Sequence, residues 1–149
     1  MKSLINTILL LLILTSCFSP KGIKFEAYEA GKKVKYFIDI PDGYQITKRQ
    51  GEVFKEYHFI YPDGAIFYYT NDHKSGGDVN KDKIEKYGKN ILIKIAVNDT
   101  LDISGCNING KFWREKKKYN FIVGYINASK KRKIEFDKAI STMQRKPGK

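Results

Sequence analysis

Few side chains of this sequence could carry nucleophilic or metal chemistry, because its 149 residues include two histidines and two cysteines. His58 lies in the segment EYHFIY, where strand alternation places it on the same face as Glu56. His73 follows Asp72 in a polar segment that also contains Asp78, yet no further ligand stands at the spacing of a metal site. These patterns predict no catalytic residue, no metal ion and no cofactor.

Two enzymatic alternatives stay open in the sequence. Cys106 and His58 would form a nucleophile–base pair if the fold brought them together. The chain also has 16 Asp and Glu residues, which could supply a carboxylate pair for glycoside hydrolysis, although nothing in the sequence selects two of them. Because neither alternative rests on a motif, the sequence favours a non-enzymatic protein.

Positive charge is concentrated in two segments. The formal net charge is +12, and cations gather at 111–118 and 130–133. In the first segment, alternation places Arg114 on one face of a strand and Trp113 on the other. Interleaved aromatic and cationic side chains are typical of surfaces that bind acidic polymers. The residues predicted for an anionic-ligand patch are Trp113, Arg114, Lys116, Lys118, Lys130, Lys131 and Arg132.

Three interpretations of these clusters are open at this point. Segment 111–118 has the charge of an edge strand that is protected against sheet-to-sheet aggregation. The same charge would attract anionic lipid or an envelope polymer, or it would mark the binding site of a protein partner. At 130–133 the cations precede or begin a helix, where they oppose the helix dipole, so local helix stability does not explain them.

The N-terminal segment has the features of a secretory signal peptide. Lys2 precedes an apolar stretch from Leu4 to Leu14 that is interrupted at Asn6 and Thr7. As a helix this stretch would be about 16 Å long, roughly half the hydrocarbon core of a bilayer, and therefore too short to span it. A positive residue followed by a short apolar run is the pattern of a signal that is removed.

The residues Leu14-Thr15-Ser16-Cys17 resemble the bacterial lipobox. This resemblance implies that residues 1–16 are removed and that the thiol and new amino terminus of Cys17 are acylated, with palmitate as the expected marker. Two or three acyl chains hold a protein firmly on a membrane, whereas one chain is marginal. We then expect a lipidated tether at 17–22, a single domain at 23–145 and a disordered tail at 146–149.

The residues around Cys17 also suggest a location. Phe18 follows the cysteine, in place of the aspartate that commonly retains lipoproteins in the inner membrane, and the tether lacks the acidic cluster that resembles a surface-export signal in Bacteroidetes-type lipoproteins. By this resemblance we expect the periplasmic face of the outer membrane of a Gram-negative bacterium, which removes nucleic acid from the list of partners. Cys106 then has no intramolecular partner, and we expect a buried thiol.

Strand patterns dominate the remaining chain. The expected strands are 23–28, 34–40, 52–61, 65–70, 90–97, 100–104, 111–118 and 120–127. Segment 90–97 (NILIKIAV) is ambiguous, but its β-branched content favours a strand over a helix. We expect one short helix at 82–87 and a C-terminal helix after Ser129. The predicted fold is α+β, an antiparallel sheet of about six to eight strands in hairpins and a meander, with both helices packed on it.

Two stretches carry a family resemblance. YFIDIPDGYQI (36–46) looks like the opening of PsbP-like α/β/α-sandwich domains, and YINASKKRKIEFDKAISTM (125–143) looks like their closing element. Segment 98–140 also resembles a group of small Bacteroidetes lipoproteins. The resemblance implies a fold and no activity, because this fold hosts unrelated functions. Asp99-Thr100-Leu101 resembles the Bacteroidetes O-glycosylation site, which would make Thr100 the acceptor.

These observations lead to one hypothesis with two alternatives. We expect a lipid-anchored lipoprotein that acts as a non-enzymatic binding or envelope-maintenance module, with an anionic envelope polymer or a protein as its further partner. The first alternative is an enzyme that acts on envelope glycan or peptidoglycan through an unrecognised carboxylate pair. The second is an immunity or inhibitor protein against a toxin. The sequence indicates no oligomeric state.

Overall fold

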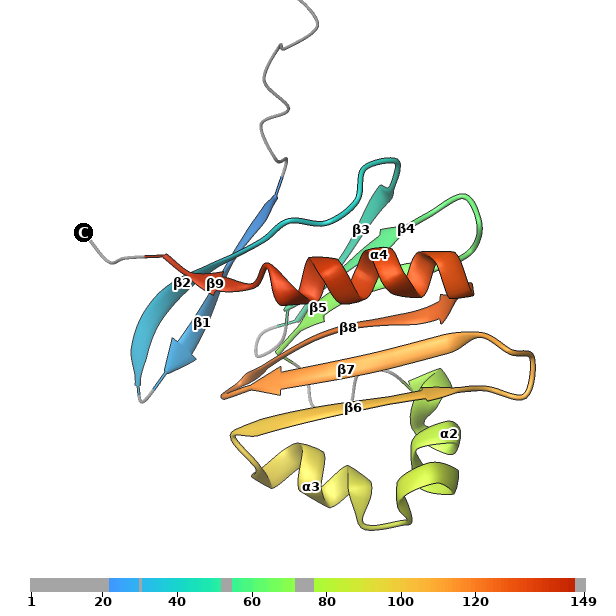
Figure 1. Cartoon of the computed structure of the whole chain (residues 1–149). Coiled ribbons are helices and arrows are strands. Elements are labelled where there is room, and N and C mark those ends of the chain that lie inside the picture. The colour runs from blue at the N-terminus through green and yellow to red at the C-terminus, as the bar shows by residue number, and fades with distance from the viewer. Residues whose placement is uncertain (1–21, 30, 52–54, 72–76, 147–149) are drawn as a thin grey trace, which may run out of the picture.

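The computed structural model describes residues 22–29, 31–51, 55–71 and 77–146. The predicted signal peptide, Cys17 and residues 147–149 lie outside these residues. In the described part, nine strands and three helices form two antiparallel sheets with helices packed on them, so the α+β prediction is confirmed (Figure 1).

The larger sheet contains six strands and the smaller one three. In spatial order the larger sheet comprises β3 (Gln45–Gln50), β4 (Lys55–Ile60), β5 (Ile66–Thr70), β8 (Phe121–Ala128), β7 (Phe112–Lys118) and β6 (Thr100–Cys106). The smaller sheet comprises β1 (Ile23–Glu29), β2 (Lys32–Ile38) and the short β9 (Gln144–Arg145). The predicted hairpins and the β6–β7–β8 meander are all present, since β1 pairs with β2, β4 with β5, and β7 with both β6 and β8.

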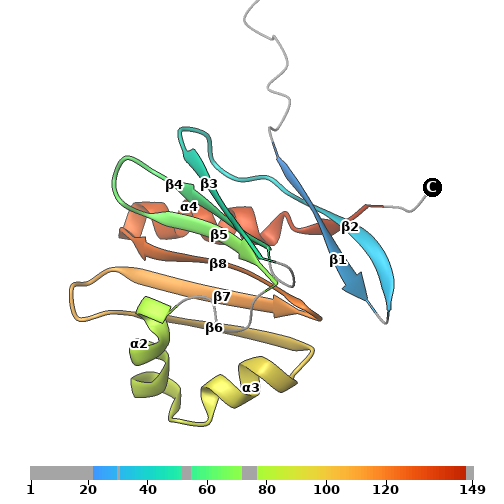
Figure 2. The same cartoon turned by 180° about the vertical axis from the view of Figure 1, so that it is seen from behind.

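The larger sheet has a hydrophobic core on each face. Neighbouring residues of β5 point in opposite directions, so Phe67 belongs to one core and Tyr68 to the other. Helix α4 (Lys130–Ser141) and the smaller sheet cover the first face, and helices α2 (Gly77–Tyr87) and α3 (Ile91–Val97) contribute to the core on the second face (Figures 1 and 2). The molecule is therefore layered around one central sheet.

The C-terminal helix begins where the sequence predicts. The hydroxyl of Ser129 accepts a hydrogen bond from the backbone N–H of Arg132 at 3.2 Å, which satisfies one of the free N–H groups of the first turn. Phe136 and Ile140 are buried four residues apart on one face of α4, together with Ala139. This apolar face holds the helix on the larger sheet.

Segment 90–97 is a helix, and the strand prediction for it is wrong. Ile91 and Ile95 are buried four residues apart, which is the helical period, whereas Ile93 is 62% exposed. The ammonium group of Lys117 donates hydrogen bonds to the carbonyls of Ile95 and Ala96 at 2.7 and 3.0 Å. These two bonds give hydrogen-bond donors to carbonyl groups at the C-terminal end of α3. This long-range contact favours the helix, whereas the β-branched composition favours a strand.

One boundary and one strand also differ from the sequence prediction. Helix α2 begins at Gly77, earlier than the predicted 82, and Gly88 follows it with a φ of +83°, which fits the expected end of the helix. Strand β3 was not predicted, because all six of its residues are exposed and it has no buried face to produce alternation. It belongs to the sheet through its pairing with β4.

Candidate functional site

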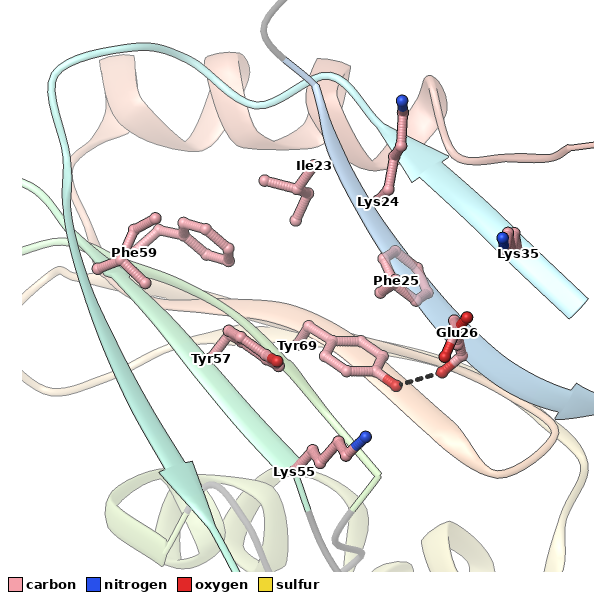
Figure 3. A pocket seen from close by; sticks show the side chains of 10 residues that line it. Ile23, Lys24, Phe25, Glu26, Lys35, Lys55, Tyr57, Phe59 and Tyr69 are labelled. Atoms are coloured by element: carbon pink, nitrogen blue, oxygen red, sulfur yellow. Dashed lines mark hydrogen bonds between the residues drawn. The ribbon is translucent and has the colours of Figure 1, made fainter. Parts of the chain in front are cut away.

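A pocket of about 520 Å³ lies between the two sheets, where β1 faces strands β3, β4 and β5 (Figure 3). We call it the inter-sheet pocket. Its apolar lining comes from aromatic rings and two isoleucines on separate strands: Ile23, Phe25, Ile46, Tyr57, Phe59 and Tyr69. Its volume falls within the range of roughly 300–1,000 Å³ that is typical of sites for one small molecule.

Contacts between Phe25 and Tyr69 join the two sheets at this pocket. Their ring centroids lie 4.4 Å apart, and the Tyr69 hydroxyl donates a hydrogen bond to the backbone carbonyl of Glu26 at 2.8 Å. Burial raises the pKa of Tyr69 to about 12, so the hydroxyl stays protonated and remains a donor at neutral pH. Figure 3 shows this bond beside the apolar lining. The wall between β1 and β5 is therefore held in place.

Charged side chains surround the apolar centre. Lys24, Lys35 and Lys55 line the pocket, together with one carboxylate, Glu26 (Figure 3). Glu26 forms an ion pair with Lys33 at 2.7 Å, and this hydrogen bond holds the pKa of Glu26 below its usual value, with smaller contributions from Lys35 and Lys55. Within the described residues, none of the three lining lysines forms an ion pair of its own. The edge of the pocket is therefore positively charged.

This lining suits binding better than bond cleavage. An apolar interior with a few charged groups at its edge is the usual construction of a small-molecule site. Glu26 is the one carboxylate among the lining residues, so these residues do not form the facing carboxylate pair of a glycosidase. The arrangement can hold a molecule with an apolar body and a negatively charged group.

The predicted anionic-ligand patch does not form one surface. Trp113 is 2% exposed and lies in the core on the α2 and α3 side, with Glu115 and Lys117 also buried on that face. Arg114 points to the opposite face. There it forms two hydrogen bonds with Asp102, each 2.8 Å long, and one with Asp137, also 2.8 Å. Trp113 and Arg114 therefore cannot contact the same ligand on the protein surface.

The edge-strand interpretation of segment 111–118 is wrong, because β7 lies between β6 and β8. Its charges serve contacts within the fold. Besides Lys117, which caps α3, the Lys118 ammonium group lies 4.9 Å from the centre of the Tyr36 ring. Lys116 is half-buried on the same strand.

The second basic segment is only partly neutralised. Arg132 pairs with Asp63 at 3.1 Å and with Glu135 at 2.6 Å. Lys130 and Lys131 are exposed in the first turn of α4 and form no ion pair with another described residue.

The Asp137 carboxylate on α4 binds two of the nearby cations and one tyrosine. Asp137 accepts hydrogen bonds from Lys133, Arg114 and Tyr125 at 2.6, 2.8 and 3.0 Å. Burial alone would raise the pKa of Asp137, but these hydrogen bonds outweigh it and lower the pKa. Asp137 thus stabilises the fold above the unfolded-state pKa of an aspartate, and that contribution is lost as the pH falls.

The other predicted site residues have the following positions. His58 contacts Glu56 on the same face of β4, as alternation predicted. Cys106 is exposed, so the buried-thiol prediction is wrong; it is the last residue of β6, at the outer edge of the larger sheet. Thr100 is exposed at the start of β6, and its glycosylation stays a prediction. Asp72 and His73 lie outside the described residues, among which no three His, Cys, Asp or Glu side chains form a group that could hold a metal ion.

Sequence reasoning missed a buried polar cluster on the α2 side of the larger sheet. The Lys83 ammonium group and the Tyr68 hydroxyl both donate to Oε1 of Glu115, at 2.6 and 2.5 Å. Burial also raises the pKa of Tyr68. Alternation places Glu115 on the same face of its strand as Trp113, but nothing in the sequence of α2 identified Lys83 as its partner. Because the Lys83 ammonium group and the Tyr68 hydroxyl both find their acceptor inside the core, we assign this cluster to stability.

No family model, no curated protein and no solved structure matches this chain. The resemblances to the lipobox and to PsbP-like domains therefore stay predictions. Within the described residues, no helix is both long and apolar enough to cross a bilayer. The inter-sheet pocket is the feature on which a functional proposal can rest.

Proposed function

We propose that this protein is a lipid-anchored, non-enzymatic binding module of the bacterial envelope. In this proposal Cys17 carries the lipid at the periplasmic face of the outer membrane, and the inter-sheet pocket holds a small apolar molecule. The observation that carries the binding role is the pocket itself, with aromatic walls from both sheets and, at its edge, lysines that form no ion pair with another described residue. The lipobox residues support the anchor.

The two alternatives from the sequence gain no support from the described residues. An enzyme acting on envelope glycan requires facing carboxylates, and the lining of the inter-sheet pocket contributes Glu26 alone. An immunity or inhibitor protein requires a surface for its toxin, and no contact of the described residues identifies such a surface. Neither alternative is proposed.

Occupancy of the inter-sheet pocket tests the binding role. We expect the full chain, purified from the membranes of a Gram-negative host, to release a bound small molecule on extraction at close to one per protein, chemically unchanged after prolonged incubation. Ile46→Asp places a charge in the apolar lining, at a side chain that is 57% exposed, and should lower the bound amount about tenfold. Native mass spectrometry and mass analysis of the extract provide the measurement.

The matched control for this experiment is Ile93→Asp. Ile93 has a similar exposure of 62%, but it lies on α3, which contributes no lining residue to the inter-sheet pocket. This variant should keep the bound molecule. An empty wild-type protein, or equal occupancy in all three proteins, would contradict the binding role.

Acylation of Cys17 tests the anchor. We expect the wild-type chain to incorporate labelled palmitate and to sediment with membranes. Cys17→Ser should abolish the label and either release the protein or leave its signal uncleaved. Cys106→Ser is the matched control, because it removes the other, exposed thiol and should leave labelling unchanged. Palmitate label that persists in Cys17→Ser would rule out the predicted anchor.

A further inference from the structure

We infer that the ligand of the inter-sheet pocket is a single-chain anionic amphiphile, one acyl chain with a negatively charged head, taken from the membrane that anchors the protein. This inference rests on the proposed function and names its ligand class. The polarity of the lining, the volume of the pocket and its position along the chain support this ligand class.

The polarity of the lining matches a molecule with two unlike ends. Phe25 and Tyr69 on one side and Phe59 on the other offer ring surfaces to an alkyl chain (Figure 3). Burying such a chain stabilises a complex, and the stabilisation grows with each CH₂ group that is removed from water. A ligand without an apolar body would gain no such stabilisation from this lining.

The lysines select the charge of the head group. Lys24, Lys35 and Lys55 come from three strands, and in Figure 3 they lie above, to the right of and below the aromatic rings. Glu26 does not cancel them, because it is already paired with Lys33 at 2.7 Å. On β4, the backbone N–H of Lys55 donates to the side-chain oxygen of Asn71 at 2.6 Å, which fixes the start of that strand. A carboxylate or phosphate at this edge would meet cations from both sheets, whereas a cationic head would be repelled.

The volume favours one acyl chain over two. At about 520 Å³ the pocket belongs with sites that hold a single small molecule. A diacyl phospholipid would need to place a second chain outside the apolar lining. We therefore assign the pocket to a free fatty acid or a lysolipid.

The position of the pocket makes a membrane-derived ligand accessible. Ile23 and Lys24 line it and are the first residues of β1, directly after the proposed tether 17–22. Six extended residues reach about 20 Å, so an acylated Cys17 would keep this edge within that distance of the bilayer surface. The pocket would then meet single-chain lipids where they leave the membrane.

The test is photolabelling of the full chain in membranes. A palmitate analogue with a photoreactive diazirine in its chain should label peptides from β1 or from β4 and β5, and mass spectrometry locates the attachment. Excess palmitate should suppress labelling, and monopalmitoylglycerol, which has the same chain without a charge, should suppress it at least tenfold less effectively. Equal suppression by both molecules would overturn the charge selection, and labelling elsewhere would overturn the site.

A matched pair of triple variants separates local from general charge. Replacing the three pocket lysines with glutamine (Lys24→Gln, Lys35→Gln and Lys55→Gln together) should lower labelling at least tenfold. The control removes the same charge from exposed positions on α4, Lys130→Gln, Lys131→Gln and Lys138→Gln. It should label within twofold of the wild type, with circular dichroism confirming that both variants are folded. An equal loss in both variants would show general attraction to the membrane and overturn the inference.

The two proposals fail in different ways. If a bound molecule is extracted from the wild type and lost in Ile46→Asp, but the palmitate analogue does not label the pocket, the binding role stands and the amphiphile assignment falls. If extraction finds no molecule and labelling is also absent, both fall.

Discussion

Lys83→Met is expected to lower the free energy of unfolding by about 3–5 kcal/mol. The two charges of the Lys83–Glu115 pair are buried, with side-chain exposures of 1% and 4%, and lie 2.6 Å apart. Methionine keeps an unbranched side chain that is one heavy atom shorter, and it removes the positive charge. Glu115 would then be a buried carboxylate that retains one hydrogen bond, from Tyr68, and no cation. Urea unfolding at neutral pH measures the effect.

Two further variants identify the cause. Lys81→Met makes the same substitution at an exposed position of α2 and should change stability by less than about 0.5 kcal/mol. Adding Glu115→Gln to Lys83→Met removes the negative charge that has lost its cation. The double variant should recover more than half of the lost free energy of unfolding. A loss in Lys83→Met no larger than in Lys81→Met would contradict the role assigned to this pair, as would a double variant less stable than the single one.

Phe136→Ala is expected to lower the free energy of unfolding by a similar amount, about 3–5 kcal/mol. Phe136 is 0% exposed and lies in the core between α4 and the larger sheet. Its ring centroid is 5.1 Å from that of Tyr61 and 5.4 Å from those of Phe67 and Tyr125. Alanine would remove all three ring contacts and leave a cavity that the paired strands cannot close.

Thermal and urea unfolding measure this second loss. Ile134→Ala lies on the same helix but removes a side chain that is 64% exposed, so it should cost less than about 1 kcal/mol. Near-equal stabilities of Phe136→Ala and Ile134→Ala would mean that α4 does not depend on its buried face.

The strands were predictable where burial alternates along them. In β2 the buried Val34, Tyr36 and Ile38 are apolar and alternate with more exposed neighbours, and β1 shows the same period. The Asn109-Gly110 turn was predictable for a local reason, because Gly110 adopts a φ of +70° between β6 and β7. Such features depend on a few neighbouring residues, so they can be recognised in the sequence alone.

The elements that were missed depend on distant partners. Helix α3 is apolar on its exposed side as well as its buried side, with Val97 69% exposed, so its composition conceals the helical period. Its end is capped by Lys117, which lies on β7. Strand β3 has no buried side chain and exists because β4 pairs with it.

The candidate site was unpredictable for a related reason. The inter-sheet pocket is a space between two sheets, and its lining comes from strands far apart in the sequence. The basic segments were conspicuous in the sequence, but their partners were not. Arg114 is neutralised by Asp102 and Asp137, which lie on other elements, so a count of charges overstated how much positive surface remained.

The short strand β9 has a consequence for the order in which the protein is built. It pairs Gln144 and Arg145 with β2, and the backbone N–H of Lys146 donates to the carbonyl of Lys35 at 2.8 Å. Contacts between residues so distant in the sequence form slowly, because a long loop must close first. A chain that emerges with its N-terminus first therefore cannot complete its smaller sheet until residues near its C-terminus have also emerged. The smaller sheet, whose strands β1 and β2 line the pocket, therefore gains its third strand only after residues 144–146 have been synthesised.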